Sequence, residues 1–314
     1  MKKVSVIGAG HVGATTTYYI AEKNIADIVM LDVLEGVPQA KGLDFSQAAP
    51  LRRYGVHIHG TNDYADIADS DVVVLTAGVP RKPGMDRMDL LKINTEIVKG
   101  AAHKIAEYAP NSTLIVVSNP LDIMCMVALD ASGFALKRVL GMAGVLDSSR
   151  FSWFIAEELQ VSVKDVRAMV LGGHGDSMVP LPRFTTVAGI PITELLNKDE
   201  IHELVDRTRK GGAEIVGYLK TGSAFYAPAA SVAEMVEAVL TNEKRIVPAA
   251  AYLRGEYGYE ALYLGVPIVI GKNGVERIIE LELTSEERSV LDRSAQAVKE
   301  GMEALRSFYT MAFK

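Results

Sequence analysis

Residues 4–13, VSVIGAGHVG, give the strongest indication of the fold. The first four of them form a short, mostly apolar run, and the residues after Gly13 have the pattern of a helix. Gly8 permits a tight turn, Gly10 lets a ligand approach the backbone, and Gly13 allows the helix to pack closely on the strand. The stretch therefore predicts a strand, a ligand-binding turn and a helix, in that order.

The surroundings of this turn indicate a dinucleotide ligand. The amino terminus of the helix can hold a pyrophosphate through its free backbone amides and its dipole. Asp32 follows a second strand-like run, where a carboxylate accepts hydrogen bonds from ribose hydroxyls and repels a 2′-phosphate. The alternative is a structural glycine turn beside a solvated aspartate. We interpret His11 as a residue of the turn rather than a catalyst. We predict NAD rather than NADP, bound by Gly8, Ala9, Gly10, His11, Val12, Gly13 and Asp32.

Short apolar runs alternate with helix-length segments through the first half of the chain. Such runs are typical of parallel strands that are buried on both faces and joined by right-handed crossovers. We predict an α/β fold, with a Rossmann-type doubly wound parallel sheet in residues 1–144 and a C-terminal α+β substrate-binding and catalytic domain in residues 145–314. The runs are residues 4–7, 28–31, 56–59, 72–75, 114–117 and 139–140.

The pattern changes from about residue 145. A stripe of apolar residues near the carboxyl end predicts a last helix that packs one face on the core and is capped by Thr284 or Ser285. The stripe consists of Leu291, Ala295, Val298, Met302 and Leu305. The other expected elements are a helix at residues 148–159, hairpin-like pieces at 166–171 and 185–192, a helix at 225–240 and an antiparallel strand around 263–270.

Composition restricts the classes of function. The chain has 314 residues, of which 23% are charged and 49% hydrophobic, as is usual for globular proteins. A net charge of -6 argues against a general nucleic-acid binder. No apolar run reaches the roughly 18 residues of a membrane span, and the opening run is too short for a signal peptide, so we expect a cytoplasmic protein without membrane contact.

Metal and disulfide chemistry are not expected. Cys125 is the only cysteine, which excludes an internal disulfide and a cysteine-based zinc site. Flanked by two methionines, it is most simply a buried thiol. No evident third ligand accompanies the histidines at positions 57, 59, 103 and 202, and we expect no metal.

Two segments of the second half carry residues suited to proton transfer. GGHGD, residues 172–176, places His174 among glycines after an apolar run, with no helical or strand stripe to explain its ring. DSSR, residues 147–150, begins a predicted helix, so Asp147 and Arg150 share one face. An aspartate in a first turn is commonly only a cap. The glycines and the nearby Asp176 favour a functional His174.

Two arginines lie in a loop at the expected binding edge of the sheet. The loop VPRKPGMDR, residues 79–87, follows the run at residues 72–75 and therefore leaves the edge where doubly wound sheets bind ligands. If Arg81 and Arg87 turn inward, they offer forked donors to two anionic or carbonyl groups of one small dianion. The alternative is that both are solvated surface charges.

Together, these motifs resemble the lactate/malate dehydrogenase family over essentially the whole chain, and most closely its lactate-dehydrogenase-like malate dehydrogenases. The loop VPRKPGM resembles the malate enzymes, whereas GSAFYAP, residues 222–228, resembles the branch closer to the lactate enzymes. The motifs that carry the resemblance are residues 8–13, 76–78, 79–87, 117–120, 147–150 and 172–176.

The resemblance implies roles for individual residues. It makes His174 the general acid/base, Asp147 its partner, Arg150 the ligand of the substrate carboxylate and Arg87 the donor that polarises the reacting carbonyl. Further substrate contacts are implied for Asn119 and Ser223. Further cofactor contacts are implied for Thr76, Ala77, Gly78, Asn94, Val117 and Asn119. The family also implies a homodimer or a homotetramer, between which the sequence does not choose.

The position of Arg81 bears on the substrate. In this family, glutamine there accompanies small neutral side chains, and arginine accompanies a second carboxylate. A buried guanidinium without a counter-ion disfavours pyruvate, whereas oxaloacetate supplies the missing charge. The resemblance therefore implies NAD-dependent interconversion of malate and oxaloacetate, with lactate or another 2-hydroxy acid as the alternative. A non-catalytic NAD-binding structural protein is the alternative of another class, and it gives no chemical reason for both His174 and Asp147.

Overall fold

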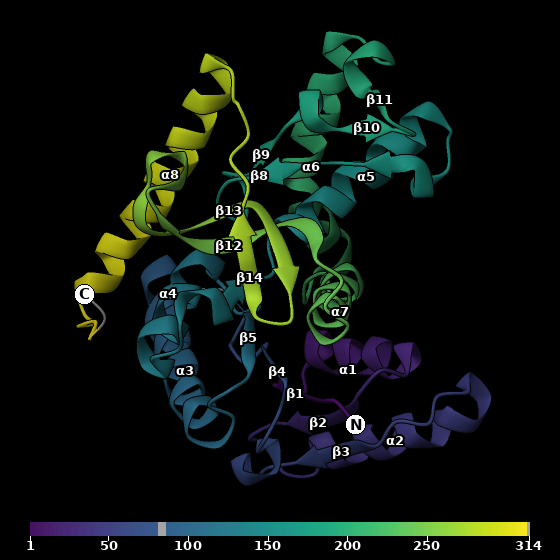
Figure 1. Ribbon diagram of the computed structural model, residues 1–314, viewed down its shortest axis with the longest axis vertical. Coiled ribbons are helices and arrows are strands. Elements are labelled where there is room, and N and C mark those ends of the chain that lie inside the picture. Colours follow the sequence, from purple (N-terminus) through teal and green to yellow (C-terminus); the bar gives the residue numbers. More distant parts are fainter. Residues whose placement is uncertain (81–85, 313–314) are drawn as a thin grey trace.

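The computed structural model describes residues 1–80 and 86–312, and a nine-stranded sheet forms the centre of this described part (Figure 1). The strands lie in the order β14-β13-β12-β6-β5-β4-β1-β2-β3. The section from β3 to β6 is parallel and confirms the predicted doubly wound sheet. Its strands are β1 (Lys3–Ile7), β2 (Asp27–Leu31), β3 (Ile58–Thr61), β4 (Val72–Leu75), β5 (Thr113–Val116) and β6 (Val139–Gly141).

The second half of the chain extends the same sheet. β12 (Arg245–Arg254) pairs antiparallel with β6, where Ala250 lies opposite Gly141. β13 (Glu260–Gly271) and β14 (Gly274–Ile278) continue the antiparallel section, as predicted for residues 263–270. Shorter strands form two small sheets, consisting of β7 (Val166–Arg167), β10 (Thr186–Val187) and β11 (Ile190–Pro191), and of β8 (Val170–Leu171) and β9 (Val179–Pro180).

Helices cover both faces of the sheet. Figure 1 shows α1 (His11–Lys23) beside α7 (Tyr226–Leu240) on one side, and α3 (Arg87–Tyr108) beside α4 (Leu121–Ser132) on the other. α8 (Ser285–Arg306) contacts α4 and α3. The remaining helices are α2 (Val37–Arg52), α5 (Gly144–Leu159) and α6 (Lys198–Leu219). In the described part of the chain, no helix has the length and apolar character needed to cross a membrane.

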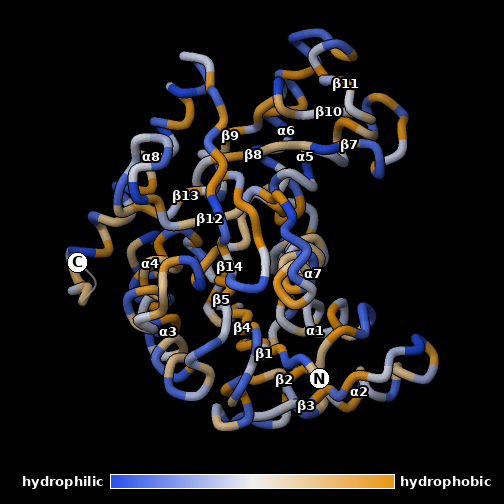
Figure 2. The backbone as a smooth tube through the Cα atoms, in the orientation of Figure 1, coloured by the Kyte–Doolittle hydropathy of each residue, from blue (hydrophilic) through white to orange (hydrophobic). Residues whose placement is uncertain are grey.

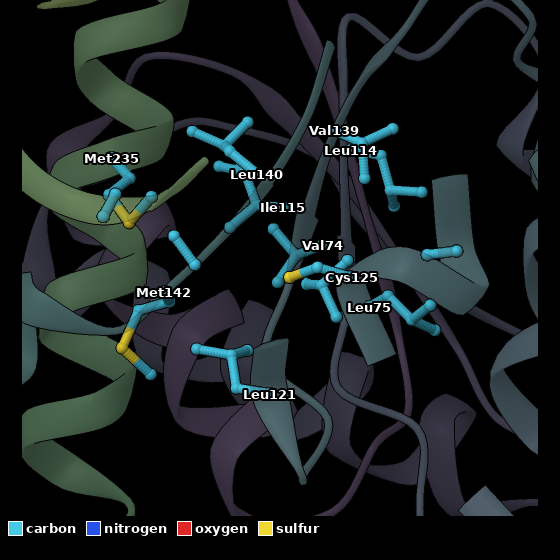
Figure 3. Close-up of a cluster of buried hydrophobic side chains, with 14 of the residues drawn as sticks. Val74, Leu75, Leu114, Ile115, Leu121, Cys125, Val139, Leu140, Met142 and Met235 are labelled. Carbon is cyan, nitrogen blue, oxygen red and sulfur yellow. The ribbon is translucent and has the colours of Figure 1, made fainter. Parts of the chain in front are cut away.

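The core lies where the parallel strands meet α4 and α7. Figure 3 shows side chains from β4, β5 and β6 packed together, with Cys125 and Leu121 from α4 and Met235 from α7 beside them. Figure 2 shows orange, hydrophobic stretches along these central strands and blue, hydrophilic stretches on outer loops. Cys125 is fully buried, as predicted, and burial raises the pKa of its thiol well above the ordinary value.

The last helix has the predicted face and cap. All five residues of the apolar stripe are buried. Thr284 is the N-cap, and its hydroxyl accepts a hydrogen bond from the Glu287 backbone N–H (3.2 Å). The Glu287 carboxylate accepts in return from the Thr284 N–H (2.8 Å), which completes a capping box.

Two predicted boundaries were wrong by a few residues. β3 runs over residues 58–61 rather than 56–59, because its parallel pairing with β2 starts at Ile28 opposite Ile58. α5 begins at Gly144, four residues before the predicted start at 148. A Cβ on Gly144 would lie 2.6 Å from Cβ of Pro248, so the glycine lets the first turn approach β12. Asp147 is consequently inside the helix.

Candidate active site

His174 lies on a tight loop that side chains from two helices hold in place. Gly172 and Gly175 have φ angles of +86° and +116°, which favour glycine. The Gly173 N–H donates to Oγ of Ser294 on α8 (2.8 Å), and the His174 N–H donates to Oδ2 of Asp122 on α4 (3.0 Å). The loop backbone is therefore clamped between α4 and α8.

The His174 ring is held by a third helix, α5. Its Nδ1 lies 2.9 Å from Oδ2 of Asp147, and Nη1 of Arg150 donates to Oδ1 of the same carboxylate (3.2 Å). Asp147 is only 2% exposed, while the side chains of His174 and Arg150 are 15% and 14% exposed. An ionised carboxylate at Nδ1 places a proton there and leaves Nε2 available for a ligand. Asp147 is thus not a helix cap, since its two oxygens contact these two side chains.

Electrostatics favour a protonated His174 over a wider pH range than usual. Burial lowers the pKa of the imidazole, but the charge and hydrogen bond of Asp147, with the charge of Asp122, outweigh this effect and leave the pKa above 6.5. Burial also lowers the pKa of Arg150, and the carboxylate of Asp147 opposes that change. The guanidinium remains charged at neutral pH.

A cavity of about 610 Å³ opens beside His174. It is lined by the starts of α3 and α4, by the loop at residues 174–177 and by one face of α8. Arg87 is the first residue of α3 and is exposed, while Asn119 precedes α4 at the same cavity. The structure therefore brings the predicted residues Arg87, Asn119 and His174 together. Arg81 lies outside the described residues.

Two polar residues of this site were missed in the sequence. Asp122 occupies the first turn of α4, and Ser294 lies on α8 beside the apolar stripe. In the sequence, Asp122 looks like an ordinary acid near a helix start, and Ser294 like a polar residue on a surface helix. Their hydrogen bonds to the histidine loop span 52 and 121 residues, so no local pattern reveals them.

The glycine-rich turn has the geometry expected for binding a dinucleotide. Gly8 has φ +107°, and a Cβ on Gly13 would lie 1.8 Å from the carbonyl oxygen of Gly8. A Cβ on Gly10, by contrast, would have no atom of the described residues within 4 Å, which leaves room for a phosphate. Within the same described part, no side chain caps the start of α1, so its first amides remain available.

Asp32 lies at the end of β2, beside this turn. Its Oδ2 accepts from the Ala9 N–H (2.6 Å) and its Oδ1 from the Leu34 N–H (3.0 Å). Lys41 of α2, which was not predicted, donates to the carbonyl of Ala9 (2.5 Å). These residues fit the ribose and pyrophosphate ends of NAD, because they combine free amides, open space and a carboxylate.

Several other predicted cofactor residues hold backbone in place. The Thr76 hydroxyl is within 3.1 Å of the carbonyls of Ile7 and Gly8. Buried Asn94 accepts from the Val79 N–H (2.8 Å) and donates to the carbonyl of Asn119 (2.7 Å). These two side chains thus support the glycine turn and the stem of the arginine loop. Ala77, Gly78 and Val117 follow β4 and β5 at the same edge of the sheet.

Two further predicted residues lie on or near α7. The His11 ring stacks on Phe225 with centroids 5.0 Å apart. Ser223 is exposed in the segment that leads into α7, outside the lining of the cavity. His11 therefore packs against Phe225, two residues after Ser223.

Comparison with known proteins gives a consistent result. Residues 2–141 match the lactate/malate dehydrogenase NAD binding domain, and residues 144–309 match the lactate/malate dehydrogenase alpha/beta C-terminal domain. Malate dehydrogenase from Heliobacterium modesticaldum is 59% identical over 298 residues, which cover 95% of this chain and 96% of that protein.

Solved structures of this family share the fold. Malate dehydrogenase from Salinibacter ruber matches with a TM-score of 0.94 and 50% identity, over 97% of this chain and 98% of that chain. Lactate dehydrogenase from Cryptosporidium parvum, complexed with lactic acid and nicotinamide adenine dinucleotide, has a TM-score of 0.94 and 42% identity, over 98% and 99% of the two chains. This chain therefore belongs to the lactate/malate dehydrogenase family.

Proposed function

We propose that this chain is an NAD-dependent malate dehydrogenase, which transfers a hydride reversibly between malate and NAD to give oxaloacetate and NADH. The observation that carries the proposal is the His174–Asp147 pair at 2.9 Å, with Arg150 on the same carboxylate. The names of relatives such as the Heliobacterium modesticaldum enzyme favour malate over lactate as the substrate.

His174 is the proposed general acid/base. Oxidation of malate releases a proton from the hydroxyl oxygen, and a base with a pKa near the working pH is suited to accept it. Neutral His174 takes this proton at Nε2, while Asp147 holds the tautomer and stabilises the imidazolium that forms. In the reverse direction, the imidazolium returns the proton to the carbonyl oxygen of oxaloacetate.

Arg150 is the proposed ligand of the substrate carboxylate next to the reacting carbon. Its guanidinium is largely buried, and Nε has no hydrogen-bond partner among the described residues. Gly211 and Gly212 of α6 lie beside it, and a Cβ on Gly211 would come within 3.3 Å of Arg150 Cδ. A buried forked donor with one charge partner is suited to a bidentate carboxylate.

The two loop arginines complete the proposed site. Arg87 would donate to the reacting oxygen, where a donor of this kind stabilises developing charge by about 3 kcal/mol. Arg81 would bind the second carboxylate of malate and thereby select this substrate. Asn119 and Ser223 are the remaining proposed substrate contacts.

The NAD site combines the turn at residues 8–13 with Asp32 and the residues that follow β4 and β5. The α1 amino terminus would bind the pyrophosphate, and Asp32 the ribose hydroxyls. When bound, NAD supplies the acceptor for the hydride. The proposed contacts are Gly8, Ala9, Gly10, His11, Val12, Gly13, Asp32, Thr76, Ala77, Gly78, Asn94, Val117 and Asn119.

Lactate or another 2-hydroxy acid is the second candidate, since a lactate dehydrogenase shares the fold closely. Steady-state rates with oxaloacetate and pyruvate at equal NADH separate the two. We expect a strong preference for oxaloacetate in the wild type and a shift toward pyruvate in Arg81→Gln. A wild-type preference for pyruvate would overturn the assignment of malate, and NADH binding without turnover of any 2-oxo acid would favour the non-catalytic alternative.

We also propose a homodimer or homotetramer in the cytoplasm, with a domain boundary between residues 144 and 145. Leu43 and Leu51 on α2, Trp153 on α5 and Tyr226 on α7 are exposed apolar side chains that contact between subunits would cover. Light scattering at micromolar concentration measures the state, and a monomer would contradict the proposal.

A further inference from the structure

A second buried carboxylate lies beside His174. Asp122 is 6% exposed in the first turn of α4, and its Oδ2 accepts the hydrogen bond from the His174 N–H at 3.0 Å. Its other oxygen, Oδ1, is buried and has no hydrogen-bond partner among residues 1–80 and 86–312. The partner of His174 in proton transfer is Asp147, so that step gives Asp122 no role.

We propose that Asp122 is a positioning residue for His174, whose carboxylate both anchors the histidine loop and adds a second negative charge that stabilises the imidazolium. This inference rests on the proposed function, because it concerns the residue that exchanges the proton with substrate. Asp122 acts through His174 and is not itself assigned a contact with the reacting atoms.

The need for a charge, rather than only an acceptor, follows from the neighbouring contact. The Gly173 N–H is bound in the same way by a neutral hydroxyl, that of Ser294, at 2.8 Å. A neutral acceptor is therefore sufficient to anchor this backbone. A buried carboxylate with one unpartnered oxygen is much more costly than a hydroxyl. A carboxylate at position 122 is explained if its negative charge stabilises the protonated ring of His174, the residue whose N–H donates to it.

The charge state of Asp122 at neutral pH is consistent with this role. Burial raises the pKa of Asp122 to about 6, although the His174 N–H and the His174 charge oppose the rise. The charge of Asp122 in turn contributes to the raised pKa of His174. Above pH 7, Asp122 is therefore mostly ionised beside the ring.

Charged and titratable groups near Asp122, its cavity or the His174 ring must be held constant in the test. They are Asp147 and Arg150 on α5, His174 and Asp176 on the loop, Cys125 on α4, Arg87 on α3 and Glu300 on α8.

The test compares Asp122→Asn with Ser294→Ala. Asp122→Asn keeps an oxygen that can accept the His174 N–H but removes the charge, whereas Ser294→Ala removes a neutral anchor and keeps every charge. The first readout is the titration of the His174 ring in apoprotein with ¹³C-labelled histidine, assigned by its loss in His174→Asn. The second is the pH profile of kcat/KM for malate, which reports groups of the free enzyme.

We expect Asp122→Asn to lower the pKa of His174 by roughly 0.5–1 unit, toward the lower end of the effect of a nearby opposite charge. The acid limb of the malate profile should move by the same amount. Ser294→Ala should change kcat and thermal stability while leaving the pKa of His174 unchanged. Asp69→Asn, an exposed change of the same charge in the loop before β4, should match the wild type throughout.

An unchanged pKa of His174 in folded Asp122→Asn would overturn the proposal. Asp122→Ser provides a second neutral acceptor if the asparagine variant does not fold, and failure of both to fold would assign Asp122 a structural role only. The two proposals fail separately: the ring titration needs no turnover, whereas an inactive wild type would refute the proposed function alone.

Discussion

The glycine turn at residues 8–13 and the histidine loop at residues 172–175 are both short, glycine-rich and placed after a strand, but they are built differently. The turn is completed by backbone groups, by Asp32, which is 23 residues from its partner Ala9, and by the Thr76 hydroxyl, which is 68 residues from Gly8. The loop is completed by side chains 27, 52 and 121 residues away. Asp32 and Thr76 follow the two strands that pair with β1, so the turn depends on one sheet, whereas the loop depends on three helices packing correctly.

Because the two regions are built differently, we expect mutations in them to have different effects. In the turn, Gly8 and Gly13 leave no room for a side chain, so substitutions there should affect folding and NAD binding together. Gly10 has room for a Cβ, so substitution there should affect NAD binding alone. In the loop, the ring is the reactive group and its surroundings adjust its charge, so substitutions should affect chemistry first.

Removing the ring should have the largest effect. His174→Asn eliminates the proposed acid/base, and we expect kcat for malate oxidation to fall by about 10²–10⁴. NADH affinity, measured by fluorescence titration, should remain within about twofold because the glycine turn is intact. A loss of less than tenfold in kcat would refute the role of His174.

Substitutions in the glycine turn should change stability and NADH binding rather than the proton-transfer step. Gly13→Ala places a Cβ 1.8 Å from the Gly8 carbonyl, and we expect a loss of at least about 2 kcal/mol in unfolding free energy. Gly10→Ala has space for its Cβ, so its stability should match the wild type while NADH binding weakens. Chemical denaturation and NADH titration measure both. Equal stability of the two variants would contradict this account of the turn.

In the wild type, malate oxidation at His174 and NADH binding at the glycine turn should depend differently on pH. The raised pKa of His174 keeps the imidazolium present above pH 6.5, so kcat/KM for malate should fall about tenfold per pH unit once pH drops below that raised pKa. Oxaloacetate reduction, which needs the imidazolium, should not lose activity on this limb. NADH binding to the glycine turn should show no such limb. A malate limb at or below pH 6.5 would show that the pKa of His174 is not raised.

The smallest effect is expected at the α8 cap. Thr284→Ala removes the hydroxyl that accepts the Glu287 N–H and should cost about 1 kcal/mol of unfolding free energy. The cap is at the start of α8, more than two helical turns before Ser294, so kcat should remain near the wild-type value. A large loss of kcat would show that the histidine loop depends on the whole of α8 rather than on Ser294.

Much of the fold could be predicted because its signals are local. The apolar runs of β1, β2 and β4 are buried on both faces, and the α8 stripe and its threonine cap follow helical spacing. The start of α5 was missed because Gly144 resembles a turn residue, and its place in a helix depends on packing against β12.

The site was predicted only in part for the same reason. His174, Asp147 and Arg150 were found from unusual neighbours and from the family resemblance, and the structure brings them into contact. Asp122 and Ser294 carry no local pattern, because their contacts exist only after α4 and α8 have packed around the loop.

The doubly wound sheet, the dinucleotide turn and the residue types available for proton transfer follow from local sequence, because they depend on apolar spacing, glycine positions and intrinsic pKa values. The packing of the folded chain adds that β12 to β14 extend the same sheet, and that Asp147 contacts both His174 and Arg150. Packing also places a second carboxylate, Asp122, beside the histidine. Burial and charge act between residues distant in the chain, so their effect on His174 exists only in the folded molecule.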